Sequence, residues 1–139
     1  MNFIKINTDL VKTVFILEDN EERIEFFNEV FKDCSKFITK NINVAIKELS
    51  RMKYDLIFLD HDLEELSVLD GSRPDYDENI ATGYPVAKEL RNTVNCETPC
   101  IIHSMNPTGA SLMYNAHPFN TYAIPYHLLK ESFIKEEKV

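Results

Sequence analysis

The sequence lacks any apolar run long enough to cross a bilayer, and it is poor in positive charge and in cysteine. Its 139 residues carry 15 Lys and Arg against 23 Asp and Glu, a formal net charge of -8. This balance argues against an extended nucleic-acid-binding surface. The cysteines, Cys34, Cys96 and Cys100, are odd in number and lack CxxC spacing, which is typical of reduced thiols. Residues 1–5 lack the apolar core of a signal peptide, so we expect a cytoplasmic protein.

The chain does contain enough apolar residues for one core. Hydrophobic residues make up 44% of the sequence, which is ordinary for a globular protein. A length of 139 residues predicts a single domain over residues 1–139. The negative charge does not exclude anionic ligands, because a bound cation can reverse the local field.

Short apolar runs predict strands at residues 14–17, 54–59, 100–102 and 121–124, with a weaker candidate at 36–39. Continuous runs without alternation are typical of strands that are buried on both faces of a parallel sheet. Helical patterns fill the intervals, so strand and helix alternate about five times. We therefore predict an α/β fold with a single, doubly wound, five-stranded parallel sheet.

Residues that can cap helices mark where the helices begin. The predicted N-caps are Asn20, Asn43, Thr82 and Asn106, and a last helix is expected over residues 127–136. The helix after Thr82 is expected to extend far enough to bury Val94. Residues 63–81 are acidic and lack periodicity, and a connection of this length is typical of a lid-like loop.

Acidic side chains follow two of the predicted strands. Glu18 and Asp19 come after the first run, and Asp60 comes after the run at 54–59. Ligands bind beyond the carboxyl ends of parallel strands, where these carboxylates can converge. Hard divalent cations prefer oxygen ligands, so Glu18, Asp19 and Asp60 predict a site for Mg²⁺ or Mn²⁺. The alternative is that these acids are solvated or cap the following helix.

Two histidines occur at the same edge of the predicted sheet. His61 lies between Asp60 and Asp62, and His103 ends the third apolar run. A histidine near carboxylates can act as general acid or base near neutral pH, which predicts catalytic roles for His61 and His103. Asp62 would orient His61 or assist the metal. Alternatively, His61 is a turn residue with one hydrogen bond and His103 is a satisfied, half-buried side chain.

Two predicted helix starts are candidate phosphate sites, because backbone N–H groups at such starts bind anions. The residues concerned are Thr82, Gly83, Ser104, Asn106 and Gly109. The Ser104 hydroxyl is expected to contact the phosphate. Ordinary helix capping explains both starts equally well.

These residues resemble a known pattern. Glu18, Asp19 and Asp60 are similar to the acidic triad of response-regulator receiver domains, which binds Mg²⁺ and accepts a phosphoryl group on the central aspartate. Receivers also carry a lysine before a proline, where this chain has Ile124 before Pro125. Three further segments resemble the receiver-like family predicted to process cyclic phosphates: 59–63 (Leu-Asp-His-Asp-Leu), 82–84 (Thr-Gly-Tyr) and 103–109 (His-Ser-x-Asn-Pro-x-Gly). The resemblance implies a receiver-like (flavodoxin-like) three-layer sandwich.

The leading hypothesis from the sequence is a metal-dependent phosphoesterase, a hydrolase that acts on RNA 2′,3′-cyclic phosphate ends or on cyclic nucleotides. Its two histidines would share the proton transfers. The second hypothesis is a signalling receiver that is phosphorylated on Asp60. The third is a non-enzymatic module that binds a nucleotide or a protein. The expected partner is a phosphate-containing small molecule or an RNA end, and the expected state is a monomer or weak homodimer.

Overall fold

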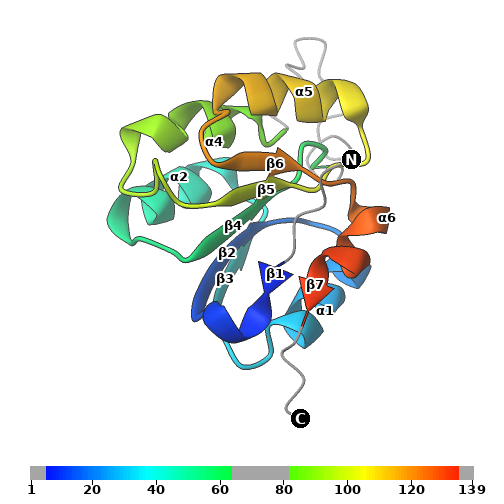
Figure 1. Cartoon of the computed structure of the whole chain (residues 1–139). Coiled ribbons are helices and arrows are strands. Elements are labelled where there is room, and N and C mark those ends of the chain that lie inside the picture. The colour runs from blue at the N-terminus through cyan, green and yellow to red at the C-terminus, as the bar shows by residue number, and fades with distance from the viewer. Residues whose placement is uncertain (1–5, 64–81, 135–139) are drawn as a thin grey trace.

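The computed structural model describes residues 6–63 and 82–134, and its centre is a parallel sheet with the strand order β3-β2-β4-β5-β6 (Figure 1). The strands are β2 Thr13–Leu17, β3 Ser35–Thr39, β4 Leu56–Leu59, β5 Cys100–Ile102 and β6 Thr121–Ala123. The predicted five-stranded parallel sheet is therefore confirmed, including its weaker candidate strand. The lid-like loop predicted at 63–81 lies, apart from Leu63, outside the described residues.

Helices cover both faces of this sheet. They are α1 Glu21–Val30, α2 Ile42–Arg51, α4 Tyr84–Glu89, α5 Pro107–Ala116 and α6 Tyr126–Leu129, with 3-10 turns η1 Thr8–Leu10, η2 Leu90–Asn92 and η3 Lys130–Ser132. Figure 1 shows α2, α4 and α5 on one face and α1 and α6 on the other. A separate pair, β1 Ile6–Asn7 and β7 Phe133–Ile134, joins the two ends of the described chain.

Side chains of the central strands alternate between the two cores. Leu17, Leu59 and Ile102 are buried in the core beneath α2, α4 and α5. Their neighbours Ile16, Phe58 and Ile101 are buried in the core beneath α1 and α6. Leu17 pairs with Leu59, and Leu59 pairs with Ile102, so these three residues are level across β2, β4 and β5. The next residue on each strand is therefore level as well, and it turns toward α1.

Two helix starts agree with the predictions and two do not. Asn20 caps α1 and Asn106 caps α5, each accepting a backbone hydrogen bond. The prediction of Asn43 as a cap is wrong. The cap is Asn41, whose side chain accepts from the Val44 N–H, so α2 begins before Asn43. Gly83 occupies the cap position of α4, although the Thr82 hydroxyl still accepts from the Tyr84 N–H.

Two predicted helices are shorter than expected. Helix α4 ends at Glu89 and passes into a 3-10 turn, so Val94 lies beyond it and is 50% exposed. Asn95 is buried there instead, and its amide donates to the carbonyls of Leu49 and Met52. The helix predicted at 127–136 is only α6 and a 3-10 turn, because the chain then extends into β7 to pair with β1. Within the described ranges, no helix combines the length and apolar character that a membrane crossing requires.

Candidate functional site

Three polar side chains occupy one row at the carboxyl ends of β2, β4 and β5. Glu18, Asp60 and His103 follow the paired residues Leu17, Leu59 and Ile102, and the ladder hydrogen bonds continue through their N–H groups. Glu18 and Asp60 are 1% and 2% exposed, and His103 is fully buried. Their ligand atoms all lie within 4.8 Å of one another. The row also lies where the chain order reverses between β2 and β4, the place where open α/β sheets bind ligands.

His103 holds the carboxylate of Glu18 in place. Its Nε2 lies 2.7 Å from Glu18 Oε1, while its Nδ1 has no hydrogen-bond partner among the described residues. Burial lowers the pKa of His103 more than the Glu18 carboxylate raises it, so the neutral ring donates from Nε2. Burial opposes ionisation of Glu18, but the hydrogen bond that His103 donates, a second one from the Asn20 N–H and the positive charge of Arg23 hold the pKa of Glu18 below its usual range.

The pKa of Asp60 shifts in the opposite direction from that of Glu18. Burial, followed by the negative charge of Glu18, raises the pKa of Asp60 to about 8. The Asp60 side chain accepts a hydrogen bond from the His61 N–H. Near neutral pH, Glu18 thus carries the negative charge and Asp60 takes up a proton. A cation bound between them would favour the ionised form of both carboxylates.

Arg23 is a site residue that the sequence analysis missed. One guanidinium nitrogen lies 3.7 Å from Glu18 Oε1 and 3.6 Å from Asp60 Oδ2. The same guanidinium lies over the ring of Tyr126, with 4.8 Å between its central carbon and the ring centroid. Arg23 belongs to the first turn of α1, whose cap Asn20 accepts from the Arg23 N–H. A signal existed in the sequence, since a helix that starts directly beyond a strand end brings its first turn to the sheet edge.

The predicted metal ligands are only partly brought together. Glu18 and Asp60 converge as expected, but the third member of the cluster is His103 rather than Asp19. Asp19 is half-buried and lines a small polar cavity of about 100 Å³ together with Glu18 and Asp60. Asn20, Arg23, Asp62 and Met105 complete the described lining. Metal ligation by Asp19 stays a prediction.

His61 lies on the other side of the sheet from His103. Its Nδ1 is 2.7 Å from Asp62 Oδ1, and its buried ring packs against Gly109 of α5. His103 instead contacts the rings of Phe27 and Phe58 beneath α1. The structure therefore pairs the two imidazoles with different carboxylates. Because adjacent positions in a strand face opposite sides, His61 turns away from the face that Asp60 shares with His103.

The two glycines predicted to bind phosphate lie at closely packed helix starts. The Gly83 N–H donates to the His61 carbonyl at 2.9 Å, and the Gly109 N–H donates to the side-chain oxygen of Asn106 at 3.0 Å. A Cβ at Gly83 would lie 2.0 Å from the Asp60 carbonyl oxygen, and one at Gly109 would lie 2.4 Å from the His61 ring. Both N–H groups have protein partners, and phosphate binding by Gly83 and Gly109 stays a prediction.

The other predicted phosphate contacts also have protein partners. The buried Ser104 hydroxyl accepts from the Asn106 N–H, and the Asn106 amide donates to Asp62 Oδ1 at 3.3 Å. Thr82 forms an isolated bridge with Asp62. Phosphate binding by Thr82, Ser104 and Asn106 stays a prediction.

The donor set at Glu18 and Asp60 fits a divalent cation. Carboxylate oxygens are the ligands that Mg²⁺ and Mn²⁺ prefer, and burial together with the charge of Glu18 raises the cost of ionising Asp60. His103 fixes the orientation of Glu18, as histidine–carboxylate pairs do around metal ligands. The two carboxylates would be the ligands, with Asp19 at the wall of the same cavity.

Comparisons with known proteins identify a family over most of the chain. The family model described as "Cyclic-phosphate processing Receiver domain" matches residues 14–117. Among proteins of curated function, none matches the sequence.

Several solved structures share the fold at low sequence identity. The receiver domain of sensor histidine kinase PA1611 from Pseudomonas aeruginosa PAO1, which has a magnesium ion coordinated in its active-site cleft, is 18% identical with a TM-score of 0.60, over 88% of this chain and 94% of that chain. A response regulator from Hahella chejuensis is 22% identical with a TM-score of 0.60, over 87% and 86%. A CheY-like receiver domain protein from Methanospirillum hungatei JF-1 is 13% identical with a TM-score of 0.58, over 87% and 90%. The fold is therefore that of receiver domains.

Proposed function

The chain belongs to the family of cyclic-phosphate processing receiver domains, and we propose that it accepts a phosphoryl group on Asp60 with the help of a divalent cation held by Asp60 and Glu18. The observation that carries this proposal is the row of Glu18, Asp60 and His103, whose ligand atoms lie within 4.8 Å of one another at the point where the strand order reverses. The signalling hypothesis therefore ranks above the phosphoesterase hypothesis.

The proposed step is a direct transfer to the Asp60 carboxylate. One carboxylate oxygen forms a bond to phosphorus, while the bond between phosphorus and the leaving oxygen breaks and that oxygen keeps the electron pair. A bound Mg²⁺ or Mn²⁺ would draw charge from the phosphoryl oxygens. Arg23, 3.6 Å from Asp60 Oδ2, supplies a second positive charge beside the acceptor. In receivers that charge comes from a lysine, whose position here is Ile124.

The size and lining of the small cavity support this reading. Its volume of about 100 Å³ suits a cation or a phosphoryl group and is too small for a nucleotide. None of its described lining residues is a histidine. Acid–base catalysis by His61 and His103 together would need both rings to reach a substrate phosphate, whereas the two rings lie on opposite faces of the sheet.

Hydrolysis of a cyclic phosphate is the second candidate, and one contact favours it. Asp62 lines the acidic cavity and also holds the Nδ1 of His61 at 2.7 Å. A carboxylate that orients an imidazole is the arrangement that general acid–base catalysis uses. In this reading His61 alone, rather than a histidine pair, moves the proton.

The test is to incubate the purified protein with Mg²⁺ and acetyl phosphate and to measure intact mass. We expect the wild type to gain one phosphoryl group and Asp60→Asn to gain none. Asp33→Asn is the matched control, because it removes an exposed carboxylate outside the acidic cavity and leaves the acceptor. Arg23→Gln should slow the reaction about tenfold or more, since it removes a charge that stabilises the transferring group.

Two results would overturn these readings separately. A wild-type protein that gains no phosphoryl group and does not bind beryllofluoride refutes the acceptor role of Asp60. The second candidate is measured by phosphorus NMR on adenosine 2′,3′-cyclic monophosphate. Conversion to a monoester by the wild type, and its loss in His61→Asn, would support hydrolysis, and a substrate that stays intact refutes it.

A further inference from the structure

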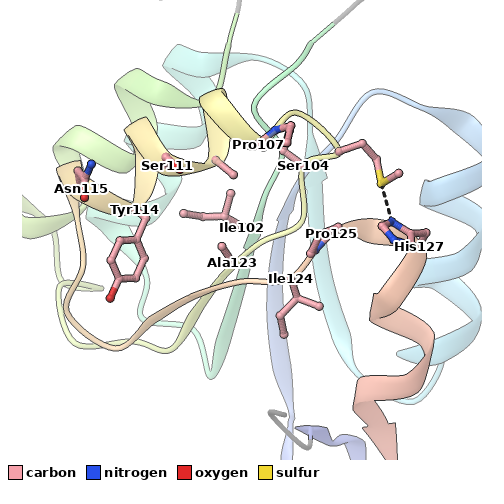
Figure 2. A pocket seen from close by; sticks show the side chains of 12 residues that line it. Ile102, Ser104, Pro107, Ser111, Tyr114, Asn115, Ala123, Ile124, Pro125 and His127 are labelled. Carbon is pink, nitrogen blue, oxygen red and sulfur yellow. Dashed lines mark hydrogen bonds between the residues drawn. The ribbon is translucent and has the colours of Figure 1, made fainter. Parts of the chain in front are cut away.

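A second, larger cavity lies at the β6 edge of the sheet, between α5 and the start of α6. It has a volume of about 560 Å³, and Figure 2 shows its walls formed by α5, by the ends of β5 and β6 and by the start of α6. This volume lies within the range of pockets that bind small organic ligands. The phosphoryl site described above makes no use of this cavity.

The two cavities meet at Met105. Its side chain lines both of them, and its sulfur lies 3.2 Å from His127 Nδ1 at the edge of the larger one (Figure 2). Ser104, which also lines the larger cavity, directly follows His103 of the acidic row. Met105 is therefore the side chain that a ligand spanning both cavities would have to pass.

The walls of the larger cavity suit a neutral, flat group with polar edges. Ile102, Pro107 and Pro125 supply apolar surface, and the Tyr114 ring is 40% exposed. Ser111 and Asn115 add hydrogen-bonding groups from the exposed side of α5. No Lys, Arg, Asp or Glu occurs among the lining residues that the structure describes. A nucleobase meets these demands, since it stacks on aromatic and apolar side chains and carries donors and acceptors at its rim.

We propose that the larger cavity binds the nucleoside part of a nucleotide whose phosphoryl group lies at Asp60. This inference rests on the proposed function for the phosphoryl group, and it names the substrate class of that site. The acidic cavity takes the charged end and the apolar cavity takes the base, with Met105 between them.

The test compares two probes that share a phosphate and differ in the base. In calorimetric titrations with Mg²⁺ present, adenosine 5′-monophosphate should bind about tenfold more tightly than ribose 5-phosphate, the gain expected when one base stacks on an aromatic ring. Ser111→Trp fills the cavity from an exposed position and should abolish this preference. Leu112→Trp is the matched control, because Leu112 is 48% exposed on the same helix and does not line the cavity.

Equal affinity of the wild type for both probes, or a preference that survives in Ser111→Trp, overturns the nucleoside site. Titrations of adenosine alone and of Asp60→Asn separate this failure from a failure of the proposed function. If adenosine binds as tightly as its monophosphate and Asp60→Asn changes neither, the nucleoside site stands and the phosphoryl site fails. If adenosine 5′-monophosphate and ribose 5-phosphate bind the wild type equally and neither binds Asp60→Asn, the phosphoryl site stands and the nucleoside site fails.

Discussion

Burial keeps two histidines of this chain neutral when the protein is folded. His103 is enclosed beneath α1 and donates to Glu18. His117, at the end of α5, is 4% exposed, and its Nε2 has no hydrogen-bond partner among the described residues. Burial, and then the positive charge of Arg91, lower the pKa of His117 below its ordinary value. Each of these histidines therefore gains a proton more readily in the unfolded chain than in the folded one.

The lowered pKa of His117 predicts a loss of stability in mild acid. Below the unfolded pKa of about 6.5 the unfolded chain binds more protons, so the free energy of unfolding falls as the pH drops toward the folded pKa. His117→Gln removes this contribution and keeps a polar side chain. We expect the wild type to lose more stability than His117→Gln between about pH 7.5 and about pH 5.5, measured by urea denaturation.

His103, Glu18 and Asp60 titrate in both proteins, so the comparison isolates His117. Parallel pH dependence of the wild type and His117→Gln would show that His117 is not held neutral by its surroundings.

At the scale of elements, the register of three strands decides which polar residues meet. Because side chains alternate along a strand, Glu18, Asp60 and His103 lie on the α1 face of the sheet. His61 lies on the α5 face. The apolar runs predict these strands, and the sequence therefore contains the information for the row once β2, β4 and β5 are aligned. The apolar runs predict polar groups at one edge of the sheet but do not assign those groups to its two faces. For that reason the pattern predicted His61 and His103 as one catalytic pair.

Helix α5 packs so closely on the end of β4 that position 109 requires glycine. A Cβ there would lie 2.4 Å from the His61 ring, which is buried and bonded to Asp62. Alanine in a helix is ordinarily more favourable than glycine by about 1 kcal/mol. Here we predict the opposite sign, with Gly109→Ala destabilising the fold by about 1–3 kcal/mol in urea denaturation, because an overpacked site must shift.

Two variants show whether the ring is the cause. Ser111→Ala, at an exposed position of the same helix, should change stability by less than about 0.5 kcal/mol. In a His61→Ala background, Gly109→Ala should lower the free energy of unfolding by less than it does in the wild type, since the clash with the ring is removed. A Gly109→Ala protein as stable as the wild type would contradict the close packing.

At the scale of the whole molecule, two kinds of cavity adjoin at the carboxyl edge of one sheet. The acidic cavity faces α1, and the larger apolar cavity faces α5. Alternating apolar runs and capping residues predict the layered fold and the edge where both cavities open. They do not predict Arg23, because a long side chain can point in many directions and only the packing against Tyr126 selects one. The predicted burial of Val94 was wrong for a related reason. The conformation of that turn is set by the buried Asn95 side chain and its hydrogen bonds, and apolar periodicity does not reveal them.

A titration with Mn²⁺, read from the EPR signal of the free ion, tests most directly whether the acidic row holds a cation. The proteins to compare are the wild type, Glu18→Gln and Glu21→Gln, because Glu21 is exposed in the first turn of α1 and its replacement removes the same charge. We predict a single Mn²⁺ site in the wild type and Glu21→Gln, displaced by Mg²⁺, and an affinity lower by about tenfold or more in Glu18→Gln. Equal affinity in all three proteins would contradict the account.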